Sequence, residues 1–307
     1  MRRLVAWLMR FATSLALRRV EVAGRHRVPR DRPVLLVANH FNGFLDPLVV
    51  GAALGRVPRF VAKDTLRKVP FLGLVLRALG VVFVRRRVDG AASNEDAFAE
   101  CRAALVARDA VAIFPEGTTH DRPHMEPLRT GAARIALGGR QDGAAGLAIV
   151  PVGVTFPDKV ALRPAALVQV GPPLDLDDVV PAGVGPEDRE AVRALTATIE
   201  QALRDVSLDF PDTETALALE QAAQVAASDE GDPDPSLQAR YDLARRLGRT
   251  SPAAQAEVRR QLGRYTTLLA GLRLTDRDVV EPTSPRRLLR SAAGIAVVVV
   301  LLGSLVA

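Results

Sequence analysis

The stretch LLVANHFNGFLDPLVVGAAL, residues 35–54, places one histidine and one aspartate directly after a short apolar run. The run VLLVA at 34–38 has the pattern of a buried strand, so we expect His40 and Asp46 in the segment that follows its end. In α/β proteins such segments carry much of the chemistry. A second interpretation is open at this point: His40 is an ordinary loop histidine, and Asp46 is the N-cap of a helix that has Pro47 at its first position.

Short apolar runs alternate with helical patterns along most of the chain, which predicts an α/β fold. The predicted strands are VLLVA (34–38), RFVAK (59–63), VVFVR (81–85), AVAIF (110–114), LAIVPVGVTF (147–156) and ALVQV (166–170). A Pro/Gly-rich break then leads into a helix that starts near Pro186. We expect one α/β domain at residues 29–210 and a helical appendage at 211–284, where Ala, Leu, Arg, Gln and Glu dominate.

The two ends of the chain have patterns typical of membrane contact. Residues 1–28 predict an amphipathic helix in the bilayer interface, and a helix packed on the soluble core fits the same pattern. The uncharged segment 291–307 follows Arg286, Arg287 and Arg290. We expect a transmembrane anchor at 285–307, with these arginines holding the body of the protein on the cytoplasmic side of the inner membrane.

Charge and cysteine content narrow the function classes. Residues 1–30 hold eight arginines against Glu21, and residues 56–87 hold nine basic residues against Asp64, although the whole chain carries only +6. Two basic zones indicate anionic partners such as phospholipid headgroups or a phosphorylated substrate. Nucleic acid fits poorly, because aromatic residues make up only 4% of the chain and no nucleic-acid-binding motif is found. The single cysteine, Cys101, lies in a helical pattern and is expected to be inert packing.

Four segments with polar, charged or proline residues near the ends of predicted strands follow one another in the predicted α/β domain. They are NHFNGFLDP after the first strand, FVAKDTLRKVPFLGLVLRALGVVFVRR with Arg85 near its end, IFPEGTTH, and IVPVGV with Pro151. Because proline is disfavoured inside a central strand, Pro151 predicts a bulge or a strand end.

In this order the four segments resemble the PlsC-type glycerolipid acyltransferase family. The family pattern is Asn-His followed by Asp, then a Gly…Arg block, Phe-Pro-Glu-Gly and a Val-Pro block. The resemblance covers roughly residues 20–205 and implies the fold of that family, an α/β fold with a mixed sheet flanked by helices. It also implies an acyl transfer.

An acyl transfer from a thioester to an alcohol needs a base near the attacking hydroxyl, and a neutral imidazole is suited to this task. His40 is the catalytic candidate, with Asp46 fixing its tautomer and stabilising the imidazolium. Five residues separate the two here, whereas the common family spacing is four. The longer spacing resembles a subgroup that includes yeast-type glycerol-3-phosphate and dihydroxyacetone-phosphate acyltransferases, and we expect Gly43 to absorb the extra residue in a turn.

The resemblance also implies residues that bind the phosphorylated acceptor. An arginine can grip phosphate through two parallel hydrogen bonds, and a glycine permits close backbone approach. The substrate-binding candidates are Arg85, Glu116, Gly117, Thr118, Asn42 and Lys63. His120 and His124 are expected to be ordinary loop histidines, because they flank Pro123 and lack further metal ligands. No metal site and no bound cofactor are expected.

We therefore expect a membrane-bound O-acyltransferase that moves a fatty acyl group from acyl-CoA or acyl carrier protein to glycerol-3-phosphate or a related glycerol phosphate. One alternative is a lysophosphatidic acid acyltransferase, or a family member with another acceptor such as an ornithine lipid precursor. A second alternative is a membrane-binding family member without catalytic activity. Membrane lipids are expected partners in each case.

Overall fold

The computed structural model describes residues 2–69, 73, 76–77, 80–84, 94–120, 122–157, 161–229 and 235–280. The chain divides into two compact units, Met1–Thr213 and Glu214–Ala307, and each is treated separately below. The anchor expected at 285–307 lies outside the described residues, as does Arg85. Within the described ranges, no helix combines the length and the apolar character needed to cross a bilayer.

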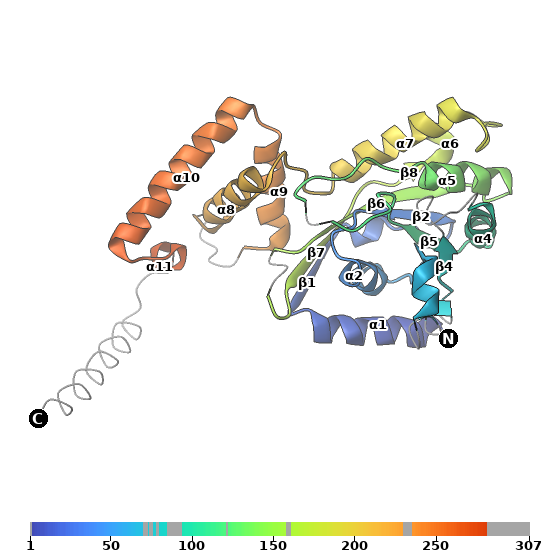
Figure 1. Ribbon diagram of the computed structural model, residues 1–307, viewed down its shortest axis with the longest axis horizontal. Helices are drawn as coiled ribbons and strands as arrows, with labels where there is room; N and C mark the ends of the chain where they lie inside the picture. The colour runs from blue at the N-terminus through green and yellow to red at the C-terminus, as the bar shows by residue number, and fades with distance from the viewer. Residues whose placement is uncertain are drawn as a thin grey trace, which may run out of the picture. The chain divides into compact units, whose positions relative to one another are not determined.

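The first unit contains an eight-stranded mixed sheet (Figure 1). Its order is β1-β7-β6-β2-β5-β3-β4, and β8 pairs with β6. Most neighbouring strands run parallel, whereas β7 and β8 are antiparallel to β6. The strands are β1 (Arg19–Ala23), β2 (Val34–Ala38), β3 (Arg59–Lys63), β4 (Val82–Val84), β5 (Ala110–Ile113), β6 (Ala148–Thr155), β7 (Ala165–Val170) and β8 (Leu174–Asp175). The six predicted strands are thereby confirmed, and within the described residues their ends shift by at most one residue.

Two features of this sheet were not predicted. The pattern assigned to an N-terminal helix over 1–28 gives α1 only at Arg2–Ala16, and residues 19–23 form the edge strand β1 instead. In RVEVA, Val20 and Val22 alternate with charged residues, as expected for a half-buried strand, and β1 pairs in register with β7. The two-residue strand β8 is too short to leave a pattern in the sequence.

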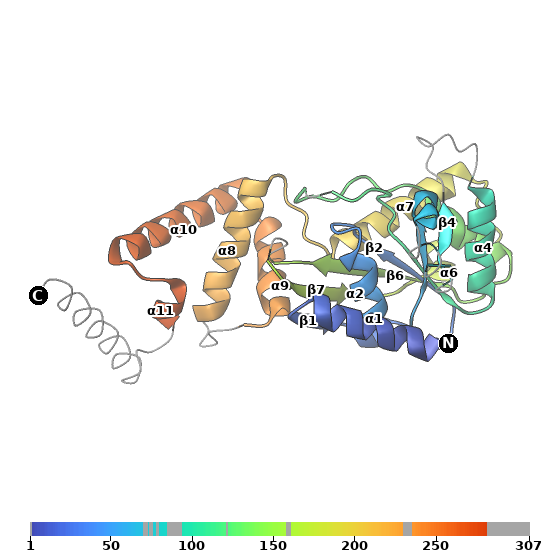
Figure 2. The ribbon, with the colours of Figure 1, turned by 60° about the horizontal axis from the view of Figure 1, so that its bottom comes forward.

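Helices cover both faces of the sheet (Figures 1 and 2). On one face lie α1 and α2 (Leu45–Ala53), and on the other lie α4 (Glu95–Val106), α5 (Gly131–Gln141) and α7 (Arg189–Arg204). Short helical segments are η1 (Arg25–Arg27), η2 (Asp64–Lys68) and α6 (Leu176–Val179). The central strand β2 is buried on both faces, which explains its continuous apolar run: Leu36 joins the core beneath α2, and Leu35 joins the core beneath α5.

The second unit is helical, as the composition of the appendage predicts. It contains α8 (Thr213–Asp229), α9 (Leu237–Gly248), α10 (Pro252–Leu272) and α11 (Asp276–Val280). Tyr241 of α9 is 1% exposed, and its hydroxyl lies 3.4 Å from an oxygen of Glu220. Leu268 and Leu272 of α10 are 65% and 67% exposed.

Cys101 lies in α4 with its side chain fully buried, which confirms its place in the core. Burial raises the pKa of this thiol from 9.0 to about 12, so it stays protonated near neutral pH. Because the thiolate is the reactive form, we expect no reaction of the native chain with a thiol reagent and one reacting thiol after unfolding in guanidinium. A colorimetric thiol titration measures this, and fast labelling of the native chain would contradict it.

Candidate active site

The site forms where β2 and β5 end. These strands are parallel neighbours, so the residues that follow them reach the same edge of the sheet. His40 follows β2 and Glu116 follows β5, and the backbone N–H of His40 donates to Oε1 of Glu116 at 2.8 Å. The topology thus joins two of the four motif segments, which lie 76 residues apart in the sequence.

His40 and Asp46 form a close pair. Nδ1 of His40 lies 3.0 Å from Oδ2 of Asp46, whose side chain is fully buried, and the His40 side chain is 15% exposed. The imidazole also stacks on Phe114, with ring centroids 4.3 Å apart. A carboxylate at Nδ1 favours the tautomer with the proton on that nitrogen. Nε2, which has no hydrogen-bond partner among the described residues, is then left as the basic atom.

The five-residue spacing between His40 and Asp46 is accommodated without loss of the pair. The side chain of Asn42 organises the turn, because its Oδ1 accepts from the backbone N–H groups of Phe44 and Leu45 at 3.1 and 3.0 Å. Its own backbone N–H donates to Oδ2 of Asp46 at 2.7 Å. Gly43 lies in this turn but has no positive φ, so its conformational freedom is not what the loop uses.

The alternative role for Asp46 as an N-cap is wrong in this structure. Helix α2 begins at Leu45, so Asp46 lies inside its first turn. The carboxylate bonds to His40 and to the backbone of Asn42, both before the helix. A carboxylate in this turn is still favoured by the helix dipole.

Glu116 connects three segments from a buried position. Its carboxylate accepts from the backbone N–H of His40 at 2.8 Å and from that of Glu126 at 2.9 Å. Its Oε2 also lies 2.6 Å from Nε2 of His120. The Glu116 side chain is fully buried, so the structure gives it a positioning role beneath His40, and its assignment to acceptor binding stays a prediction.

His120 is one of the site residues that the sequence analysis missed. Its side chain is 8% exposed, it pairs with Glu116, and its ring meets Phe41 edge-on at 5.4 Å between centroids. It is therefore a buried partner of the site rather than an ordinary loop histidine. In the sequence, His120 lies four residues after Glu116. This spacing predicts contact between two side chains only in a helix, whereas these residues form a loop.

We expect His120→Ala to lower kcat by about tenfold, because it removes one of the two groups that bond Oε2 of the buried Glu116 carboxylate and so loosens the support of His40. His120→Gln should recover most of the loss, because the glutamine amide can donate to Glu116 from nearly the same place as Nε2. Steady-state kinetics of both variants test this, together with their thermal midpoints. Equal loss in the two variants, at equal Tm, would contradict a positioning role that acts through Glu116.

The other predicted residues occupy the same loops or strand ends. Gly117 has φ +67°, a left-handed conformation that favours glycine, and a Cβ there would lie 2.7 Å from Nε of Arg129. Thr118 is half-buried in the same loop, and Lys63 ends β3, the strand on the far side of β5. Arg129 was not predicted; it is exposed, and its guanidinium has no partner among the described residues.

Pro151 lies inside strand β6, which corrects the expectation of a strand end, and beside it the antiparallel pairing of β6 shifts by one residue between β8 and β7. Its Cα pairs with Val37 of β2 on one side. On the other side, its carbonyl accepts from Gly171, in the gap between β8 and β7. In a β-strand, the N–H and C=O groups of one residue point to the same side. The N–H that Pro151 lacks would therefore point into the gap between β8 and β7, so its absence removes no hydrogen bond to β2.

Comparison with known proteins places these features in context. Residues 19–155 match the family model described as Acyltransferase. The chain is 30% identical over 133 residues to glycerol-3-phosphate O-acyltransferase 2 of Saccharomyces cerevisiae, covering 43% of this chain and 18% of that protein. It is 31% identical over 136 residues to a 1-acyl-sn-glycerol-3-phosphate acyltransferase of Borreliella burgdorferi, covering 44% of this chain and 50% of that protein. The chain thus spans half or less of each of these two relatives.

A solved structure is also similar. It is the crystal structure of the 1-acyl-sn-glycerophosphate acyltransferase PlsC from Thermotoga maritima, with a TM-score of 0.48 and 22% identity. The match covers 67% of this chain and 79% of that one.

Proposed function

The chain belongs to the PlsC-type glycerolipid acyltransferase family, and on that premise we propose that it is a membrane-bound O-acyltransferase of phospholipid biosynthesis. The acyl donor is acyl-CoA or acyl carrier protein, and the acceptor is glycerol-3-phosphate or a related glycerol phosphate. The observation that carries this proposal is the His40–Asp46 pair, joined at 3.0 Å at the edge of the sheet with Nε2 left as a base.

The reaction follows from this geometry. Nε2 of His40 removes the proton of the acceptor hydroxyl as its oxygen attacks the carbonyl carbon of the thioester. The tetrahedral intermediate then collapses, the C–S bond breaks, and the thiolate leaves and takes up the proton from the imidazolium. The carboxylate of Asp46 stabilises the imidazolium between these steps. No covalent acyl-enzyme is needed, because the acceptor itself is the nucleophile.

Three residues support a phosphorylated acceptor. Lys63 and Arg129 are cations that belong to the same group of loops and strand ends as His40, and Arg129 packs against Gly117. Arg85, outside the described residues, directly follows β4, whose Val84 pairs with Lys63. Guanidinium groups bind phosphate through paired hydrogen bonds, so these positions suit the phosphate of the acceptor.

A second acceptor is favoured by a specific observation. One of the relatives similar to this chain is named a 1-acyl-sn-glycerol-3-phosphate acyltransferase, and its similarity is no lower than that of the yeast relative. Lysophosphatidic acid carries the same phosphate as glycerol-3-phosphate and differs by one acyl chain. The two acceptors therefore share the polar half of the site.

Membrane attachment is part of the proposal. The uncharged segment 291–307 would anchor the chain, and Arg286, Arg287 and Arg290 would keep the catalytic unit on the cytoplasmic face of the inner membrane. The exposed apolar side chains of α1 support contact with the same bilayer.

Acyl transfer measured with each acceptor tests the proposed function. Purified full-length protein is given labelled long-chain acyl-CoA with glycerol-3-phosphate or, separately, with lysophosphatidic acid, and then the same acceptors with acyl carrier protein as donor. We expect a labelled product with one acceptor, which identifies the substrate. Absence of product with both acceptors and both donors would contradict the proposal.

A further inference from the structure

A cavity of about 500 Å³ lies between α1, β1 and α2 in the first unit. Five of the twelve residues that line it are arginines, and no aspartate or glutamate is among them. The arginines are Arg10, Arg18, Arg19, Arg25 and Arg163. No residue of the His40 site lines this cavity, so its charge serves another purpose.

Two of these arginines are already engaged inside the protein. Arg163 donates to the backbone carbonyls of Ser14 and Leu17 at 2.6 and 3.2 Å, so its guanidinium caps the C-terminal end of α1. Arg19 forms an ion pair with Glu21 at 2.6 Å.

Two others are available to a ligand. Arg10 and Arg18 are exposed, and within the described parts of the chain their guanidinium groups have neither a hydrogen bond nor an ion pair. Uncompensated guanidinium groups around one hollow favour an anion with several oxygens, and phosphate is the group they bind best.

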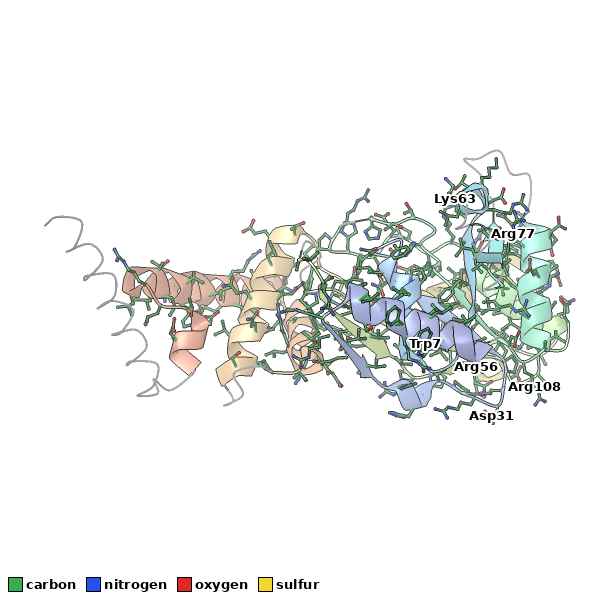
Figure 3. All side chains as sticks on the ribbon, turned by 90° about the horizontal axis from the view of Figure 1, so that it is seen from below. Trp7, Asp31, Arg56, Lys63, Arg77 and Arg108 are labelled. Atoms are coloured by element: carbon green, nitrogen blue, oxygen red, sulfur yellow. The ribbon has the colours of Figure 1, made fainter. Side chains whose placement is uncertain are left out.

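The neighbouring face of α1 is apolar and open to solvent. Trp7, Leu8, Phe11 and Leu15 share this face at helical spacing and are 54%, 48%, 51% and 61% exposed. Trp7 and Phe11 stack with ring centroids 5.6 Å apart. Trp7 is labelled on α1 in Figure 3. Thr13 and Leu17, on the opposite side of the helix, are buried. An exposed apolar row of this kind, rimmed by charge, marks an interaction surface.

We propose that this surface binds an anionic phospholipid in a bilayer, with its phosphate in the arginine-lined cavity and the apolar face of α1 between neighbouring acyl chains. The arginine-lined cavity lies beside the apolar face of α1, and this combination favours an anionic phospholipid. A soluble phosphate would contact the arginines alone, and a zwitterionic bilayer would contact the apolar face alone. The inference deepens the membrane attachment proposed above by naming its surface and lipid class. It does not depend on the acyl-transfer reaction.

Trp7 is the only tryptophan of the chain, so its fluorescence reports directly on this face. The full-length protein is placed in lipid nanodiscs of phosphatidylcholine with a rising fraction of phosphatidylglycerol. We expect the emission to move to shorter wavelength as phosphatidylglycerol rises, and to be quenched by brominated acyl chains. This readout works whether or not another segment anchors the chain, and it needs no turnover.

A double substitution tests the cavity. Each arginine near an anionic surface contributes about fivefold in affinity, so Arg10→Gln with Arg18→Gln should weaken the response roughly 30-fold and abolish the shift over the usable range of composition. The matched control is Arg189→Gln with Arg193→Gln. It makes the same charge change on two exposed residues of α7, which covers the other face of the sheet, and should respond like the wild type.

Four results would overturn the proposal. They are an unchanged response in the cavity variant, an equal loss in the α7 control, a full shift in pure phosphatidylcholine, and suppression of the shift by inorganic phosphate at constant ionic strength. The last would identify a site for small anions instead of a lipid. Circular dichroism melting curves verify that both variants fold, as expected for exposed side chains without partners.

Discussion

Replacing His40 by asparagine should lower kcat/KM for acyl transfer by about 10²–10⁴-fold, the usual loss when a general base is removed. Asparagine is the informative choice because its amide can take the place of Nδ1 and donate to Oδ2 of Asp46, which lies 3.0 Å away in the native pair. The buried carboxylate then keeps a hydrogen-bond donor, while the basic Nε2 and the ring stacked on Phe114 are lost. Tm should therefore stay close to that of the wild type.

A companion variant separates chemistry from folding. His40→Ala removes both the base and the donor to Asp46, so it should show a similar loss of rate with a lower Tm. His26→Ala is the matched control, because His26 is exposed in η1 and should leave both quantities unchanged. Acyl transfer at near wild-type rate in His40→Asn would remove His40 from the mechanism.

The centre of the sheet could be predicted because β2, β5, β6 and β7 are buried along their whole length. The fully buried strand β2 gives a short continuous apolar run, and β6 gives a run rich in Ile and Val that Pro151 and Gly153 interrupt; both patterns favour strands. The sequence analysis assigned edge strand β1 to the amphipathic N-terminal helix, because the five residues of β1 begin only two residues after α1 and include charged side chains. Pro151 was taken as an interruption of its own strand, whereas the interruption lies between the neighbouring strands β7 and β8.

The site was predicted as a set of residues but not as an arrangement. Residue types and order indicated the pair of His40 and Asp46, and the structure brings the two together. That Glu116 would lie beneath His40 depends on β2 and β5 being parallel neighbours, which a sequence pattern does not state. The role of His120 depends in turn on Glu116 and on a loop whose path is set by the backbone bond from Glu126.

Asp46→Asn should lower kcat/KM by about 10²-fold or more, and the structure indicates why this variant isolates charge from geometry. In the native site, one oxygen of Asp46 accepts from both the backbone N–H of Asn42 and Nδ1 of His40. An asparagine amide must keep its oxygen at that place, because an NH₂ group there would face the Asn42 N–H. The His40 tautomer is then retained, and what is lost is the negative charge that stabilises the imidazolium.

The double variant His40→Asn with Asp46→Asn tests whether the two residues act together. If Asp46 acts through the imidazolium of His40, Asp46→Asn should cost nothing further in a His40→Asn background, because residues that act as one unit are not additive. A thermal melt of each variant controls for folding, with Tm of Asp46→Asn expected near the wild-type value. A further 10²-fold loss in the double variant at unchanged Tm would mean that Asp46 contacts the reacting groups directly. Full activity in the single variant would show that five intervening residues leave the pair as support for α2 rather than a base and its partner.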